Sequence, residues 1–280
     1  MWSVHHTVAG LVTDKVGDNR AEQTNYYRER VDPETEITRP HCYPTSVRFL
    51  LDFKLAQTLE LLGQPVQGMT ALVVCAGSGM DSEYLFRRGM RVIAADLSLD
   101  ALRRAKERAR RYGLDYALVV ADAEHLPFRN GAVDLTFVHD GLHHLPDPIP
   151  AIREMIRTCS KAVAIAEPAQ APITRLAVLI GLSGNYEDVG NYVYRFTPKQ
   201  LRNIFEQAGM IGCTFRQHLI YCQPWTFRIY RLFEPAPLSW LFRFGFYVLN
   251  LMLGRWGNSL KAVAWKTSRN HVINAGEKDD

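Results

Sequence analysis

Two adjacent histidines, His143 and His144, follow an apolar run at residues 133–138, and Glu167 follows the next apolar run at 162–166. Short apolar runs of this kind predict buried strands, and the carboxyl ends of parallel strands meet at one edge of a sheet. A neutral imidazole can accept a proton from a hydroxyl, and a nearby carboxylate orients the ring and stabilises its cation. The spacing therefore predicts a general base, with His143, His144 and Glu167 as the catalytic residues.

A glycine-bearing turn lies ahead of these residues, between two further apolar runs. Residues 71–96 read as a strand, a turn that contains Gly77 and Gly79, a short helix and a second strand that ends at Asp96. Glycine lets backbone approach a ligand closely, and a ribose-binding acid belongs about 20 residues further on in nucleotide-binding units. A dinucleotide fingerprint has a third glycine, but this chain has Ser82 there. The turn alone leaves a nucleotide ligand and a purely structural turn open.

The elements that must position these residues alternate along the chain. Ser98 is a predicted helix cap with Gly113 at the far end, and Thr197 and Pro198 open a later helix. Predicted strands lie at 72–74, 92–95, 117–120, 133–138, 162–166, about 211–221 and 260–265. This order predicts an α/β fold with a doubly wound, Rossmann-like seven-stranded sheet, mostly parallel with an antiparallel C-terminal hairpin.

The chain divides into a core and three additions. The predicted core covers residues 45–222 and 259–268, and begins with a helix of helical apolar spacing. Residues 1–44, rich in aromatics and prolines near their end, predict an N-terminal lid or flexible segment. Residues 223–258 predict a hydrophobic helical insertion in the C-terminal hairpin, and residues 269–280 a polar tail.

Composition narrows the class of partner. The net charge of +4 is mild, and basic residues such as those at 102–113 suit a solvated helix face, so nucleic acid is not expected. The five cysteines form no CxxC pair and no zinc-like spacing, which predicts no metal. The first ten residues have no basic stretch followed by an apolar core, so we predict a cytoplasmic protein with reduced thiols.

Five segments in order carry a resemblance: VVCAGSG (73–79), AADLS (94–98), ADAEHLPF (121–128), VDLTFVHDGLHHLPDP (133–148) and YRFTPKQLRNIFEQAGM (194–210). The chain resembles the class I S-adenosylmethionine-dependent methyltransferases of the small-molecule type, and is similar to natural-product sugar O-methyltransferases. The resemblance covers about residues 45–222 and the last strand. Two positions depart from the family pattern, because its first acid is Val73 here and its first glycine is Cys75.

The resemblance implies S-adenosylmethionine as the cofactor. The turn after the first strand would approach its amino-acid part, Asp96 its ribose hydroxyls, Asp122 its adenine amine, and His139 would lie beneath the methionine part. The implied cofactor-binding residues are Cys75, Ala76, Gly77, Gly79, Asp96, Leu97, Asp122, Ala123 and His139.

The predicted function is O-methylation of a hydroxyl on a sugar, glycan or secondary metabolite, with one histidine as base. The sequence slightly favours His144, although either histidine also suits a helix cap or packing beneath the cofactor. An N- or C-methyltransferase of a lipid or quinone-like acceptor is the first alternative. A non-catalytic S-adenosylmethionine-binding protein is the second, favoured by Val73 in place of the acid.

Two regions outside the core motifs are candidates for acceptor or partner contact. Leu238 to Leu253 is apolar on all sides, which is typical of a helix that is buried, forms a homodimer, or contacts a membrane or a lipid-linked acceptor. The other region offers aromatic and hydrogen-bonding groups for a small-molecule acceptor, with surface packing as the alternative. The predicted substrate residues are Tyr27, Tyr186, Tyr192, Tyr194 and Arg195.

Overall fold

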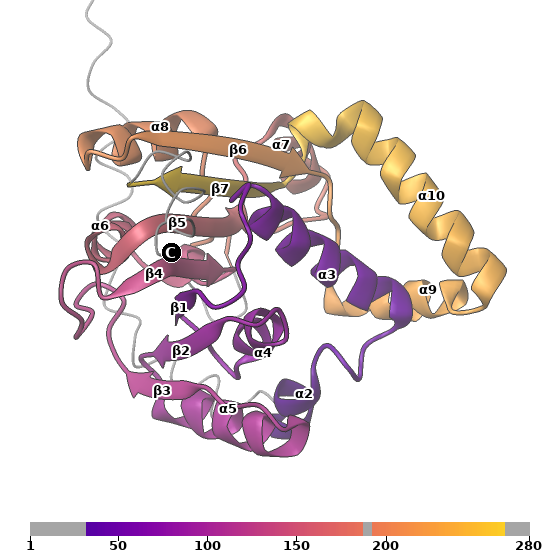
Figure 1. The fold of residues 1–280 in the computed structure, drawn as a ribbon. Coiled ribbons are helices and arrows are strands. Elements are labelled where there is room, and N and C mark those ends of the chain that lie inside the picture. Colours follow the sequence, from indigo (N-terminus) through magenta and orange to yellow (C-terminus); the bar gives the residue numbers. More distant parts are fainter. Residues whose placement is uncertain (1–31, 187–191, 267–280) are drawn as a thin grey trace, which may run out of the picture.

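The computed structural model describes residues 32–186 and 192–266. A seven-stranded sheet in the order β3-β2-β1-β4-β5-β7-β6 forms its centre (Figure 1). The strands are β1 (Thr70–Val74), β2 (Arg91–Asp96), β3 (Ala117–Val120), β4 (Val133–His139), β5 (Cys159–Pro168), β6 (Gly212–His218) and β7 (Ser259–Trp265). Strand β7 is antiparallel to both β5 and β6, whereas β1 to β5 pair in parallel. The predicted fold class is confirmed.

Helices cover both faces of the sheet because alternate strand residues point to opposite faces. On one face, Leu59 of α3 (Thr45–Glu60) and Leu85 of α4 (Met80–Phe86) pack with Phe137 of β4. On the other face, Ile152 of α6 (Ile149–Thr158) and Phe205 of α8 (Pro198–Gln207) form a second cluster. The sheet is thus buried on both sides, which leaves its edges for polar chemistry.

Predicted caps set where two of the helices begin. The Ser98 hydroxyl accepts a hydrogen bond from Ala101 N at 3.2 Å at the start of α5 (Leu99–Tyr112). Thr197 caps α8 in the same way, by accepting from Gln200 N at 3.1 Å. Because Ser98 starts α5 two residues after Asp96, the chain turns away from the sheet at the point where Asp96 ends β2.

The described part of the N-terminal segment contains α2 (Pro33–Thr38), which packs near α5. Fully buried Arg108 of α5 connects three segments, because its guanidinium donates to the carbonyls of Ser78 and Glu36 and to the carboxylate of Glu83, at 2.7–2.9 Å. The basic helix 102–113 is therefore not only a solvated face. Residues 1–31 and 269–280 lie outside the described residues.

The segment between β6 and β7 is helical. It comprises η2 (Pro224–Thr226), α9 (Phe227–Tyr230), η3 (Arg231–Phe233), α10 (Ala236–Leu253) and η4 (Gly254–Trp256). In Figure 1, α10, drawn in yellow, stands away from the sheet. By length and composition alone, the helical stretch 236–256 is long and apolar enough to cross a membrane. Helix α7 (Pro172–Leu179) lies between β5 and α8 in the chain, and η1 (Leu142–His144) follows β4.

Candidate active site

Two loops meet at the carboxyl edge of β1 and β4. Cys75, after β1, has φ 53°, and Asp140, after β4, has φ 48°. Non-glycine residues rarely adopt this left-handed backbone, and such strain concentrates at functional sites. A Cβ on Gly141 would lie 2.5 Å from the Cβ of Cys75, so only glycine fits there. Sequence reasoning missed Gly141, because this contact joins segments more than 60 residues apart.

His143 and Glu167 form the predicted histidine–carboxylate pair. His143 Nδ1 lies 2.8 Å from Glu167 Oε2, and both side chains are buried. The other carboxylate oxygen, Glu167 Oε1, accepts hydrogen bonds from Gly141 N and Leu142 N, each at 2.8 Å. An ionised carboxylate only accepts hydrogen bonds, so the proton of neutral His143 resides on Nδ1. Its Nε2 is then the basic nitrogen.

His144 has different surroundings from His143, although their ring centroids are only 4.1 Å apart. Its side chain is half-buried, and Glu167 pairs with His143 instead. Burial raises the pKa of Asp96, while hydrogen bonds from Ser98 N and Gly77 N and the nearby charge of His144 oppose that rise. The charge of His144 acts on Asp96, whereas the contact of 2.8 Å with Glu167 belongs to His143.

Two backbone N–H groups hold Asp96, the predicted ribose-binding acid. Asp96 accepts from Gly77 N through Oδ2 and from Ser98 N through Oδ1, both at 2.8 Å. A carboxylate has about four lone-pair positions, so two remain for the vicinal hydroxyls of a ribose. The space before Gly77 is open, because a Cβ there would meet only Arg39 Nη2, at 3.9 Å.

Gly79 differs from Gly77, although the sequence suggested one role for both. A Cβ on Gly79 would lie 2.6 Å from Tyr116 Oη and 3.1 Å from Ala105 Cβ. The close packing of the turn against α5 thus accounts for this glycine without a ligand. Of the two, only Gly77 faces space that a cofactor could occupy.

The predicted adenine side of the site combines apolar and polar groups. Leu97 follows Asp96 with 47% of its surface exposed, which suits contact with a flat ring. Asp122 Oδ1 accepts from Glu124 N at 2.9 Å, and this bond shapes the turn after β3. The side chains of Ala76 and Ala123 are buried, so these two residues would offer a ligand mainly their backbone.

A row of charged side chains of alternating sign lies next to the strained loops. Buried His139 has Nδ1 2.9 Å from Asp81 Oδ1 and Nε2 3.1 Å from Asp140 Oδ2. Burial alone would lower the pKa of His139, but the two carboxylates outweigh this effect and raise its pKa to about 9. Lys54 Nζ contacts the oxygens of Asp140 at 2.5 and 2.6 Å. His139 is therefore a cation at neutral pH, between two acids.

This row of charged side chains was only partly predictable. His139 was expected beneath the methionine part of the cofactor, but its contact with Asp81 and the contact of Lys54 with Asp140 were missed. Lys54 lies within the apolar pattern of a predicted helix, where a single lysine gives no sign of an ion pair. Val73, at the position of the family's acid, is fully buried among apolar side chains and offers no charge.

The predicted substrate residues separate into two groups. Tyr194 lies beside His143, because its N donates to His143 O at 3.4 Å, and Gln200 donates to its hydroxyl. Tyr186 and Tyr192 form an exposed edge-to-face pair with ring centroids 5.7 Å apart. Arg195 donates to the Asn185 side chain and to Gly184 O, which holds the segment that bears Tyr186. Tyr27 lies outside the described residues.

Asp140, His143 and Glu167 have ligand atoms within 4.8 Å of one another, close enough to share a metal ion. Their protein contacts explain the cluster without one. Glu167 is engaged by His143 and two backbone N–H groups, and Asp140 by Lys54.

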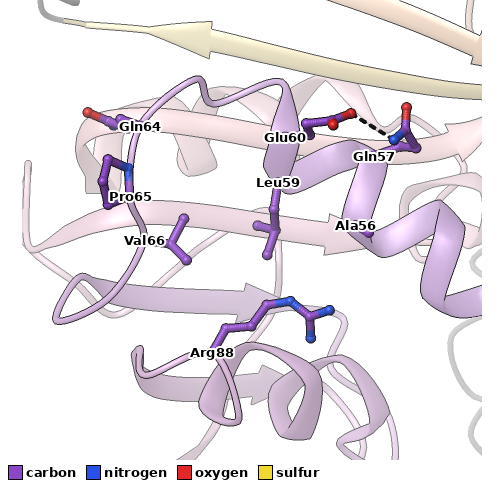
Figure 2. A pocket seen from close by; sticks show the side chains of 8 residues that line it. All are labelled: Ala56, Gln57, Leu59, Glu60, Gln64, Pro65, Val66 and Arg88. Carbon is purple, nitrogen blue, oxygen red and sulfur yellow. Dashed lines mark hydrogen bonds between the residues drawn. The ribbon is translucent and has the colours of Figure 1, made fainter.

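A surface hollow of about 330 Å³ lies away from these residues (Figure 2). Its lining includes Gln57 and Glu60 of α3, Arg88, and Pro65 and Val66 in the loop before β1. That loop enters the sheet at the edge opposite the carboxyl ends of the strands. None of the predicted site residues lines the hollow, so it is not the candidate active site.

Residues 72–165 match the model of a methyltransferase domain family. The chain is 35% identical over 119 residues to a demethylmenaquinone methyltransferase of Thermobifida fusca, covering 41% of this chain and 50% of that protein. It is 27% identical over 235 residues to a ubiquinone biosynthesis O-methyltransferase of Caulobacter vibrioides, covering 81% and 83%. The chain spans half or less of the first curated relatives that it matches.

Solved structures share the fold. Magnesium protoporphyrin IX methyltransferase from Synechocystis, with bound S-adenosylhomocysteine, has a TM-score of 0.61 at 15% identity, covering 89% of this chain and all of that one. The same enzyme with bound S-adenosylmethionine gives a TM-score of 0.58. Residues 72–165 therefore match a methyltransferase domain, and the chain shares its fold with a methyltransferase that binds S-adenosylmethionine and S-adenosylhomocysteine.

Proposed function

We propose that this protein transfers the methyl group of S-adenosylmethionine to a ring hydroxyl of a quinol-like small molecule, with His143 as general base. The observation that carries the proposal is the buried contact of 2.8 Å between His143 Nδ1 and Glu167 Oε2 at the carboxyl edge of the sheet. Relatives that are named for menaquinone and ubiquinone methylation favour a quinone-type acceptor over a sugar. Their names do not support the sugar acceptor that the sequence suggested.

The residues divide the work of the reaction. S-adenosylmethionine supplies a methyl group on a good leaving group, so the protein mainly has to align acceptor and methyl carbon. His143 Nε2 would take the proton of the acceptor hydroxyl, which makes the hydroxyl oxygen a stronger nucleophile. Glu167 fixes the His143 tautomer and stabilises the imidazolium, while Gly141 N and Leu142 N hold the carboxylate in place. Asp96 would hold the ribose hydroxyls of the cofactor.

Methylation at a ring carbon is the second candidate, because the Thermobifida fusca relative is named for demethylmenaquinone. Loss of the hydroxyl proton from a quinol makes both the oxygen and the neighbouring ring carbons nucleophilic. The same base would therefore serve either product. Mass spectrometry and NMR of the labelled product distinguish an O-methyl from a C-methyl group. The same assay should also test a sugar hydroxyl as acceptor.

The test compares two histidine variants with matched chemistry. We expect His143→Ala to lower turnover by about 10² to 10⁴-fold with S-adenosylhomocysteine binding intact, the range typical of general-base removal. His144→Ala should stay within about tenfold of wild type. Glu167→Gln should lose turnover to a similar extent as His143→Ala, because an amide N–H opposite Nδ1 forces the other tautomer. Wild-type turnover in His143→Ala would remove the base assignment.

A non-catalytic S-adenosylmethionine-binding protein is excluded by the same assay if label reaches any acceptor. Calorimetry with S-adenosylmethionine and with NAD comes first. Tight binding of NAD without S-adenosylmethionine would overturn the proposal.

A further inference from the structure

Helix α10 is attached to the domain along one narrow stripe. The ring of buried Phe246 packs edge-to-face on Phe53 and Phe49 of α3, with centroids 4.8 and 5.3 Å apart. Asn250 Oδ1 accepts from Leu219 N at 2.7 Å, and Asn250 Nδ2 donates to Leu219 O at 3.1 Å. These contacts hold α10 against α3 and the end of β6, so the position of the helix is fixed by the core.

The rest of the α10 surface is apolar and exposed. A surface helix of a globular protein normally presents polar residues on the face opposite its buried stripe. In α10 that face carries large apolar side chains, with Leu251 88% exposed and Trp240 67% exposed. The exposed large hydrophobic residues of α10 are Leu238, Trp240, Leu241, Phe244, Tyr247, Val248, Leu249, Leu251 and Met252.

The charges around this face are almost all positive. Exposed Arg228, Arg231 and Arg255 precede or follow α10, and Arg243 lies within it, over the ring of Phe49 of α3. Glu234 is the one acid between residues 223 and 258. Exposed tryptophans accompany the arginines at both ends, as at a membrane interface. Lys261, which the sequence suggested as a further flanking charge, is fully buried beside His218 and takes no part.

We propose that the outer face of α10 lies flat in the surface of an anionic lipid bilayer, with the flanking arginines at the phosphate level. An apolar face with basic borders is the signature of an interfacial helix. The 18 residues of α10 reach about 27 Å at the usual helical rise, slightly short of a bilayer core of about 30 Å.

A spanning arrangement conflicts with the connections of α10. Helix α9 before it packs on α3, and β7 after it lies inside the sheet between β5 and β6. Both ends of α10 therefore belong to one domain on one side of a bilayer. A two-fold dimer through this face would set four arginines and one glutamate against the same charges, whereas phosphate headgroups neutralise them.

A second exposed apolar patch lies in and after α7, the helix that follows β5 in the chain. Leu176, Leu179, Ile180 and Leu182 in and after α7 are exposed, and the Tyr221 hydroxyl ties Leu182 O to the segment that leads into the insertion. Helix α7 begins soon after β5 ends beyond Glu167. Resting on the proposed function, an exposed apolar surface on the helix that follows Glu167 suits an acceptor with a lipid tail that reaches the base from the bilayer.

The experiment is vesicle sedimentation of the full chain. We expect binding to phosphatidylcholine vesicles that contain 30% phosphatidylglycerol, and at least tenfold weaker partitioning onto pure phosphatidylcholine. Phe244→Glu/Leu251→Glu should reduce partitioning at least tenfold, because both side chains are exposed and the fold does not need them. Ile211→Glu is the matched control, since Ile211 is 67% exposed outside the insertion. Circular dichroism checks that each variant folds.

Three results would overturn the proposal. The first is wild-type protein that stays in the supernatant with both vesicle types. The second is vesicle binding by the double variant equal to that of the wild type. The third is a wild-type protein that binds no vesicles and is a dimer in solution, with a monomeric double variant. Quenching of tryptophan fluorescence by brominated lipid should accompany true insertion and be weaker in Trp240→Phe. Vesicle binding without methyl transfer would reject only the proposed function, and transfer without vesicle binding only this inference.

Discussion

Two regions break the usual rule that charged side chains are exposed and apolar side chains are buried. They are the candidate active-site edge, at the carboxyl ends of the strands, and helix α10. The edge buries ionisable groups, among them His139, His143 and Glu167, whereas α10 exposes apolar side chains such as Leu251. His139, His143 and Glu167 each have close polar partners, as the cost of burying charge requires. The outer face of α10 has none within the described chain.

The contacts at the edge are made within the protein, whereas the exposed apolar face of α10 is available to other molecules. Hydrogen bonds within the protein hold the buried polar side chains of this edge. Its residues can therefore be kept in strained positions around a ligand. Within the described residues, α10 is buried only on the side that carries Phe246. Substitutions at the edge should therefore alter chemistry and pH dependence, while those on α10 should alter stability on one face only.

The largest effect should separate the two faces of α10. We expect Phe246→Ala to lower the free energy of unfolding by about 3 kcal/mol, as truncation of a buried phenylalanine usually does. Leu251→Ala should change it by less than about 0.5 kcal/mol, because its side chain is 88% exposed. Urea unfolding without lipid measures both. Equal losses would show that α10 is buried against a second surface in solution.

His139 should give the edge a distinctive pH dependence. Its pKa of about 9 in the folded state lies above the usual 6.5, so its contribution is complete below pH 6.5 and is lost as pH rises through 9. The difference in unfolding free energy between wild type and His139→Gln should therefore shrink, by on the order of 2 kcal/mol, between these limits. Urea titrations across this range test it, with exposed His125→Gln as control. A constant difference would contradict the ion-pair account.

Asp96 tests the cofactor side of the edge. Asp96→Asn should weaken S-adenosylhomocysteine binding by about 10 to 100-fold, because a charged acceptor of hydrogen bonds is lost. Calorimetry measures the affinity. Asp100→Asn, in the exposed pair with Arg103, should leave it unchanged. Binding by Asp96→Asn within twofold of wild type would argue against the ribose contact.

The smallest effect concerns the contact between the two strained loops. Gly141→Ala should cost about 1–2 kcal/mol, because its Cβ would lie 2.5 Å from Cys75 Cβ. Cys75→Gly should restore part of that loss in the double variant, and thermal unfolding of the four proteins gives the coupling. Additive losses would mean that the loops relax independently.

Much of the scaffold was predictable from local pattern. The apolar runs, the caps at Ser98 and Thr197 and the order of the motifs indicated the sheet, its antiparallel addition and the edge where Asp96 and Glu167 lie. Side-chain pairing was less accessible. His143 and His144 are adjacent and chemically identical in the sequence, and only the approach of Glu167 from another strand distinguishes them.

The sequence by itself thus determined the fold class, the methyltransferase-type motifs and the apolar character of residues 238–253, because period, capping and composition are local properties. The tertiary structure decided which histidine the acid supports, why Gly141 and Gly79 are glycines, and that Lys54 pairs with Asp140. It also decided that α10 is exposed rather than buried. These features depend on contacts between residues far apart in the chain, and no local pattern encodes such contacts.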